Sequence, residues 1–132
     1  MLYTLDTNFV SQLLNSNQTA LVNLRNAIQG GHDVVFNAVC YYEIKRGLVL
    51  PTFQKKLRAF DALVRKHGLL DLDRPALDEA IAIYQVLRRQ GNLIEDADLL
   101  MGAIAKANGA TLVTHNARHF QRISGLTLDD WQ

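Results

Sequence analysis

Two hydrophobic patterns alternate along this chain. Short apolar runs are typical of buried strands, and between them hydrophobic side chains recur every three or four positions, which is the spacing of amphipathic helices. Strands that alternate with helices in this way form a parallel sheet with both faces covered. We therefore predict an α/β fold with a central, mostly parallel sheet of four to five strands, flanked by helices. The predicted strands are residues 2–5, 33–36, 69–72, 111–114 and, more weakly, 126–128.

Local signals mark where several helices begin and end. Thr7 or Asn8 is expected to cap the helix after the first strand, and Asn37 the helix after the second. Asp73-Arg74-Pro75 is a helix-start signal, and Asn108-Gly109 is a stop. In parallel α/β sheets ligands bind outside the carboxyl ends of the strands. A functional site is therefore expected among the residues that directly follow each strand.

Composition narrows the class of protein but names no partner. The 132 residues are 48% hydrophobic and 20% charged, which fits one globular domain over residues 1–132. The net charge of +1 does not by itself predict nucleic-acid binding. Cys40, the one cysteine, is expected to be a packing residue. The sequence has no secretory signal and no apolar run of about 18 residues, so we expect a cytoplasmic protein without a membrane span.

Acidic and amide side chains recur at the predicted carboxyl edge of the sheet. In chain order they are Asp6, Glu43, Asp96 and Asp98, with Thr114 and Asn116 after the fourth strand. If the first, second and fourth strands are neighbours, these side chains converge on one cleft. Each also has an ordinary alternative. Asp6 and Asp96 could be helix caps, the helix dipole would favour Asp98, and Glu43 could form a surface ion pair.

A cluster of carboxylates would need compensation. Two carboxylates about 5 Å apart repel by about 3 kcal/mol at an effective dielectric near 20. Three such pairs would cost on the order of 10 kcal/mol, which is comparable to the stability of a domain. The cluster must then be partly protonated or hold a cation. Oxygen ligands select hard cations, so Mg²⁺ is expected, with Mn²⁺ as a substitute, and such ions suit phosphoryl chemistry.

Four motifs occur in order along nearly the whole chain. They are LDTN, YYEIKRG, IEDADLLMGAIAKANGATLVTHNARHF and the ending GLTLDDW. Together they resemble the PIN-domain ribonucleases of the VapC toxin type, and the DADLL-to-THNARHF block is the most specific part. The resemblance implies a PIN-like three-layer sandwich and Mg²⁺- or Mn²⁺-dependent cleavage of RNA. It also implies a homodimer and a cognate VapB-type antitoxin that blocks the site.

Position by position, the resemblance also implies roles for individual residues. The catalytic set is Asp6, Glu43, Asp98, Thr114 and Asn116. Asp6, Glu43 and Asp98 would hold the metal, and Asp96 would assist because its position is acidic in part of the family. Asn116 stands where the family often has Asp. It would ligate through its amide oxygen or orient a water, and the lost charge favours one metal over two. Thr114 would hydrogen-bond Asp6 or the phosphate.

Contacts to larger partners are less sharply indicated. Arg46, Arg118 and His119 flank the acidic positions and could hold RNA phosphates, although a solvated surface charge is the commoner explanation for each of them. The RNA substrates considered are tRNA and rRNA. Apolar candidates for the antitoxin or dimer surface are Phe9, Leu13, Leu14, Phe53 and Leu57, which a monomer core would explain equally well.

Three other functions are weighed against this one. A PIN domain could bind RNA or a protein without cleavage, which the Asn at position 116 would favour. The domain could also be a housekeeping RNA-processing nuclease. A signalling receiver domain would gather Asp residues and Mg²⁺ in a similar way. It would need an acidic pair after the first strand and a Lys after the fourth, and this sequence has neither.

Overall fold

A computed structural model describes residues 1–131, so Gln132, the last residue of the predicted domain, lies outside the described residues. The helices are α1 (Thr7–Leu14), α2 (Gln18–Gln29), α3 (Ala38–Gly47), a 3₁₀ helix (Pro51–Phe53), α4 (Gln54–His67), α5 (Arg74–Arg89), α6 (Asp96–Ala107) and α7 (Ala117–Phe120). The strands are β1 (Leu2–Leu5), β2 (Asp33–Asn37), β3 (Leu69–Leu70), β4 (Thr111–Val113) and β5 (Leu128–Asp129).

The five strands form one parallel sheet in the order β3-β2-β1-β4-β5. The central strand β1 pairs with β2 on one side and with β4 on the other, so Tyr3 lies between Val34 and Thr111. The predicted parallel sheet is confirmed, and the first, second and fourth strands are indeed neighbours. From β1 the chain builds outward through β2 to β3 on one side and then returns to build β4 and β5 on the other side. The switch point at which α/β sheets bind ligands therefore lies between the carboxyl ends of β1 and β4.

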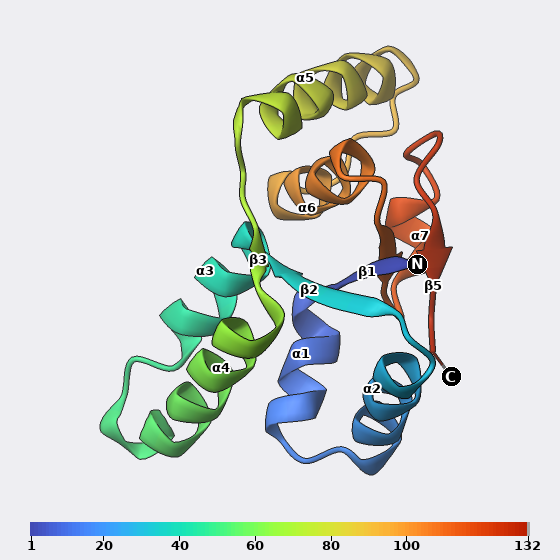
Figure 1. Ribbon diagram of the computed structural model, residues 1–132. Helices are drawn as coiled ribbons and strands as arrows, with labels where there is room; N and C mark the ends of the chain where they lie inside the picture. The colour runs from blue at the N-terminus through green and yellow to red at the C-terminus, as the bar shows by residue number, and fades with distance from the viewer. Residues whose placement is uncertain (132) are drawn as a thin grey trace.

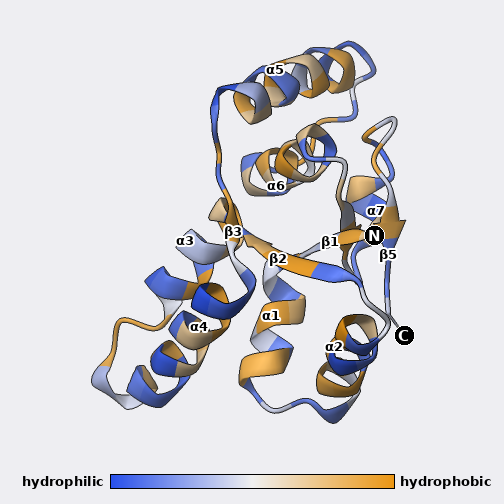
Figure 2. Cartoon of the chain, in the orientation of Figure 1, coloured by the Kyte–Doolittle hydropathy of each residue, from blue (hydrophilic) through white to orange (hydrophobic). Residues whose placement is uncertain are grey.

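Helices cover both faces of the sheet and make three layers (Figure 1). On one face α1, α2, α3 and α4 enclose a core that includes Phe9 and Phe60. On the other face α5 and α6 enclose a second core that includes Leu87 and Ile104. The strand β2 between them is mostly hydrophobic, whereas α5 alternates between hydrophobic and hydrophilic residues (Figure 2). Within residues 1–131, no helix combines the length and hydrophobicity that a membrane-spanning segment needs.

β2 is one residue longer than predicted and β4 one residue shorter, and the two outer strands differ more. β3 ends at Leu70, not at residue 72, because its partner β2 ends at Asn37, which pairs with Leu70 and then begins α3. β5 is shifted toward the C-terminus because Leu128 pairs with Leu112 of β4, while Leu126 packs into the core beside α6. The sequence did not predict α7. Cys40 is fully buried, as expected of a packing residue.

Candidate functional site

Asp6 is fixed by three hydrogen bonds at the end of the central strand. Its backbone N–H donates to the Val113 carbonyl of β4 at 3.0 Å. Its Oδ1 accepts from the backbone N–H of Phe9 at 2.9 Å, and its Oδ2 accepts from the Thr114 hydroxyl at 2.5 Å. The cap of α1 is therefore Asp6, and the prediction of Thr7 or Asn8 is wrong. Asp6 itself has an extended backbone, and Thr7 is the first helical residue. The helix therefore begins one residue earlier than a cap at Thr7 would place it.

Burial sets the electrostatics of Asp6, which is only 4% exposed. Desolvation raises the pKa of this carboxyl above its ordinary value, and the negative charge of Asp98 adds to the rise. The hydrogen bonds from Thr114 and Phe9 act in the opposite direction but do not cancel the effect of burial. The carboxylate is thus oriented by its partners yet poorly solvated, and a nearby cation would favour its charged form.

Glu43 reaches the same region from α3, the helix that Asn37 caps. Its Oε1 accepts from the Thr7 hydroxyl at 2.6 Å, which links α3 to α1. Its Oε2 lies 3.6 Å from Arg46 Nη2, so the ion pair considered from the sequence is present. Lys45 does not take part, because it pairs with Asp61 at 2.7 Å. One oxygen of Glu43 therefore faces a hydroxyl and the other faces a cation.

Asp98, His119 and Asn116 form a polar cluster between α6 and α7. His119 Nδ1 lies 3.1 Å from Asp98 Oδ2 and 3.0 Å from the Asn116 side-chain amide. Because a carboxylate only accepts and the Asn116 NH₂ only donates, Nδ1 either carries a proton and bonds to Asp98 or lacks one and accepts from Asn116. The Asn116 backbone N–H donates to the Thr114 hydroxyl at 2.9 Å. Since Thr114 in turn donates to Asp6, a chain of polar contacts connects the ends of β1, β4, α6 and α7.

One pocket of about 240 Å³ gathers most of the predicted site. Its lining residues are Asp6, Thr7, Asn8, Glu43, Glu95, Asp98, Met101, Asn116 and His119. Thr114 is buried and contacts Asp6. Asp96 is exposed and lies outside this lining, in which Glu95 takes part instead. Glu95 also occupies the cap position predicted for Asp96.

Helix geometry explains the exchange of Asp96 for Glu95. Residues two apart on a helix do not share a face, whereas residues three apart do. Asp98 faces the pocket, so Glu95 can line it together with Asp98 and Asp96 cannot. The same spacing was visible in the sequence and could have identified Glu95. Thr7 was also missed as a partner of Glu43, because a hydroxyl at a helix start suggests only a cap.

The donors in this pocket suit a hard divalent cation. Asp6, Glu43, Asp98 and Asn116 all offer oxygen atoms, which Mg²⁺ and Mn²⁺ prefer. Among residues 1–131, no three His, Cys, Asp or Glu side chains stand together as a ready-made metal-binding group. In this structure Asp6, Glu43 and Asp98 each turn a carboxylate oxygen toward a hydrogen-bond donor of the protein.

The predicted RNA-contacting residues occupy different surroundings. His119 lines the acidic pocket, Arg118 is exposed on α7, and Arg46 lies over the Tyr42 ring at 5.1 Å from its centroid. His115, which follows Thr114 at the end of β4, is stacked on Phe9 with ring centroids 5.9 Å apart. Of these side chains, His119 and Arg46 contact acidic residues, and His115 lies near enough to Asp6 to lower the pKa of that carboxyl.

Known proteins match this chain over almost its whole length. The model of the PIN domain family matches residues 3–126. Ribonuclease VapC1 of Haemophilus influenzae (strain R2866) is 26% identical, with 99% of this chain and 98% of the relative covered. The tRNA(fMet)-specific endonuclease VapC of Shigella flexneri is 31% identical over a shorter stretch that covers 59% of each chain.

Solved structures agree with the sequence matches. A chain of the Rickettsia felis VapBC2 complex bound to promoter DNA is 24% identical and superposes with a TM-score of 0.90, with 100% of both chains covered. A chain of VapBC-1 from nontypeable Haemophilus influenzae is 25% identical, with a TM-score of 0.84 and 99% and 98% of the two chains covered. The resemblance found in the sequence motifs is confirmed, and this chain belongs to the PIN domain family.

Proposed function

We propose that this protein is the endoribonuclease toxin of a VapBC-type toxin–antitoxin pair and that it requires Mg²⁺ or Mn²⁺. The ribonuclease class expected from the sequence agrees with the names of the relatives, which match nearly full length. The observation that carries the proposal is the pocket at the carboxyl end of the central strands, which Asp6, Glu43 and Asp98 line together. A domain that binds RNA without cleavage would have no need for this arrangement.

Each polar residue has a distinct task in this mechanism. Asp6, Glu43, Asp98 and Asn116 would hold the cation, which supplies positive charge for the RNA phosphate and makes water a better nucleophile. Thr114 fixes the Asp6 carboxylate through its hydroxyl, and Thr7 does the same for Glu43. His119 would help to orient Asp98 through the contact of its Nδ1 with the carboxylate. Arg46 would balance the charge of a phosphate that enters beside Glu43.

The first test is cleavage of a mixed pool of tRNA and rRNA. We expect cutting with Mg²⁺ or Mn²⁺ and none with EDTA, because the carboxylates alone would repel the phosphate. If water is the nucleophile, the products carry 5′-phosphate and 3′-hydroxyl ends, which end-labelling and mass spectrometry can distinguish. A 2′,3′-cyclic phosphate would show that the ribose hydroxyl attacked. Cutting that persists in EDTA would remove the proposed role of the acidic pocket.

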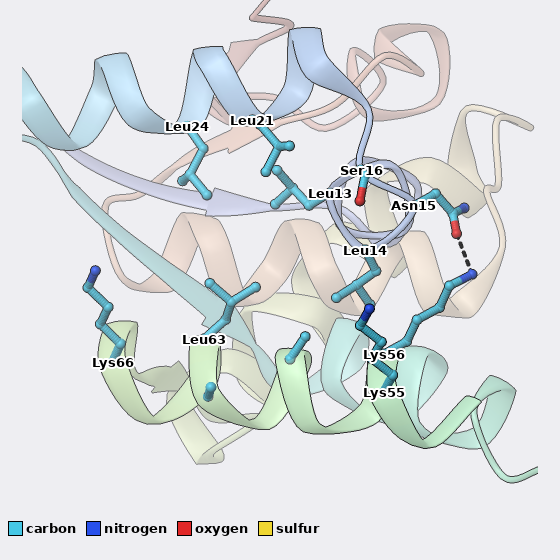
Figure 3. Close-up of a pocket in the computed structure, with 12 residues that line it drawn as sticks. Leu13, Leu14, Asn15, Ser16, Leu21, Leu24, Lys55, Lys56, Leu63 and Lys66 are labelled. Carbon is cyan, nitrogen blue, oxygen red and sulfur yellow. Dashed lines mark hydrogen bonds between the residues drawn. The ribbon is translucent and has the colours of Figure 1, made fainter. Parts of the chain in front are cut away.

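A separate groove is the proposed docking surface for the VapB-type antitoxin. It has a volume of about 660 Å³ and lies between α1, α2 and α4 (Figure 3). Leucine side chains from all three helices face it, and three lysines of α4 stand along it. These residues are Leu13, Leu14, Leu21, Leu24, Leu63, Lys55, Lys56 and Lys66. Apolar walls beside cations suit an amphipathic segment with leucine-like anchors and acidic flanks.

Only part of the predicted apolar set belongs to this groove. Leu13 and Leu14 line it, whereas Phe9 is buried in the core. Phe53 lies outside the lining and packs against the Lys56 ammonium, and Leu57 is outside it as well.

Charge reversal tests the groove without touching the acidic pocket. In the double variant Lys55→Glu with Lys66→Glu, inhibition of RNA cleavage by the cognate antitoxin should weaken by about tenfold or more, since like charges would then face each other. Arg58→Glu with Arg65→Glu is the matched control, because it makes the same charge change on α4 outside the groove lining. Titration of cleavage against antitoxin measures both. Equal loss in the two variants would contradict docking in the groove.

A homodimer is also proposed, as the resemblance implied. The candidate surface is the outer face of α5, where Leu77 and Ile81 are exposed one turn apart. The molar mass in solution, measured by light scattering, decides this: a monomer at micromolar concentration would exclude it.

A further inference from the structure

A second pocket adjoins the acidic one and has a different character. It has a volume of about 310 Å³ and lies between α3 and α6. Its walls are mainly apolar and are formed by Val39, Leu72, Ala97 and Leu100. Glu43 lines both this pocket and the acidic pocket, so its side chain is a wall that the two pockets share.

Tyr42 and Arg46 complete this second pocket and are both largely exposed. Tyr42 is 61% exposed, and the Arg46 side chain is 59% exposed. The Arg46 guanidinium lies 5.1 Å from the centre of the Tyr42 ring and 3.6 Å from Glu43 Oε2. A large aromatic ring, a cation and an apolar cavity therefore stand together within reach of the acidic site. The core packing of α3 uses Val39, Cys40 and Ile44 and does not account for Tyr42.

A nucleotide matches these three features. Its base is flat and aromatic and can stack on a tyrosine or enter an apolar cavity, while its phosphate is attracted by a guanidinium. The pocket volume is near the lower end of the range of about 300–1,000 Å³ found for small-ligand sites. A base within a duplex cannot enter such a cavity, so only an unpaired nucleotide fits.

We propose that the pocket between α3 and α6 holds one unpaired nucleobase of the RNA next to the cleaved phosphate, with Tyr42 stacked on that base. This inference rests on the proposed ribonuclease function and adds a determinant of cleavage-site choice. Arg46 would hold the phosphate that connects this base to the scissile position. A base is favoured over a second copy of the chain, because the pocket shares Glu43 with the acidic site and carries a cation suited to a phosphate.

The test pairs a protein variant with a matched change in the RNA. Single-stranded oligonucleotides are cut by the unaltered protein and by Tyr42→Ala, with kcat and KM measured separately. We expect KM to rise by about tenfold or more in Tyr42→Ala and the base preference at one flanking position to disappear, since the stacking contact is lost. Replacing that base by an abasic residue should raise the KM of the unaltered protein by a similar factor. The KM of Tyr42→Ala should not change.

Controls separate stacking from general damage. Tyr42→Phe keeps the ring and should behave like the unaltered protein, and Val49→Ala, at another exposed apolar residue, should change neither KM nor cleavage sites. Thermal unfolding should be unchanged in all three variants. If Tyr42→Ala cuts the same sites with the same KM, the base pocket is refuted while the nuclease function stands.

Two further outcomes are decisive in other ways. A changed molar mass of Tyr42→Ala would assign the pocket to a protein interface and overturn the proposal. If the unaltered protein cuts no RNA, the proposed function fails independently. Binding of intact and abasic oligonucleotides, followed by fluorescence anisotropy, then tests the pocket directly. Equal affinity for both oligonucleotides would refute it.

Discussion

Asp6→Asn is expected to abolish RNA cleavage while leaving the fold intact. Asn can cap α1 as Asp does, because its carbonyl oxygen can still accept from the Phe9 N–H. Its amide nitrogen would face the Thr114 hydroxyl, which can rotate to accept a hydrogen bond. The loss of a negative charge from the pocket should weaken cation binding and lower the cleavage rate by about a hundredfold or more.

The same substitution should not lower the stability of the protein measured without metal. Burial disfavours the charged form of Asp6, as its raised pKa indicates, so a neutral side chain of the same shape relieves a cost. We expect the free energy of unfolding in EDTA to be equal or higher in Asp6→Asn. Urea unfolding measures this quantity, and cleavage assays with Mg²⁺ measure the activity. A variant that loses both together would indicate a structural role for Asp6 alone.

Asp73→Asn is the matched control for this experiment. Asp73 caps α5 in the same way as Asp6 caps α1, since its Oδ1 accepts from the Ala76 N–H at 3.1 Å. It lies outside the acidic pocket, so its replacement by Asn should leave RNA cleavage unchanged. If both variants lost activity equally, the effect would belong to helix capping and not to the charge of Asp6.

The sheet could be predicted well because its signals are local. Short apolar runs and the caps Asn37 and Asp73 are each readable within a few residues, and the structure confirms them. The lengths of β3 and β5 could not be read in this way. They are set by where the neighbouring strands β2 and β4 end, which depends on pairing between distant parts of the chain.

The acidic residues of the site could be predicted from the sequence, but their hydrogen-bond partners could not. Asp6, Glu43 and Asp98 follow from chain position and motif, and one pocket brings them together. The bonds from Thr7 to Glu43 and from His119 to Asp98 join helices far apart in the sequence, so no spacing rule reveals them. No local pattern singles out Tyr42, because the cavity beside it is formed together with α6.

Asn37→Asp is expected to be among the most destabilising single substitutions in the chain. Asn37 is fully buried, and its Oδ1 caps α3 by accepting from the Cys40 N–H at 2.9 Å. Its amide nitrogen donates to the Leu5 carbonyl at 3.0 Å and to the Thr4 hydroxyl at 3.2 Å. These two bonds join β2 to the end of β1, directly before Asp6, so Asn37 also helps to position the acidic site.

A carboxylate at position 37 would place an acceptor where a donor is required. It would face the Leu5 carbonyl oxygen and add a buried charge close to Asp6. We expect the free energy of unfolding at neutral pH to fall by about 3 kcal/mol or more, since a buried charge would have no compensating partner. Burial would raise the pKa of the new carboxyl, so the folded state would bind a proton more readily than the unfolded state. The loss should therefore shrink as the pH is lowered.

Asn17→Asp provides the comparison that isolates burial from capping. Asn17 caps α2 in the same manner, accepting from the Ala20 N–H at 3.0 Å, but it is exposed. Asp is as good a cap as Asn and is favoured by the helix dipole, so this change should alter the free energy of unfolding by no more than about 0.5 kcal/mol. Urea unfolding of both variants at neutral and acidic pH gives the contrast. Similar small effects at both positions would mean that the Asn37 amide does not hold β1 and β2 together, and the positioning of Asp6 would then depend on Thr114 and Val113.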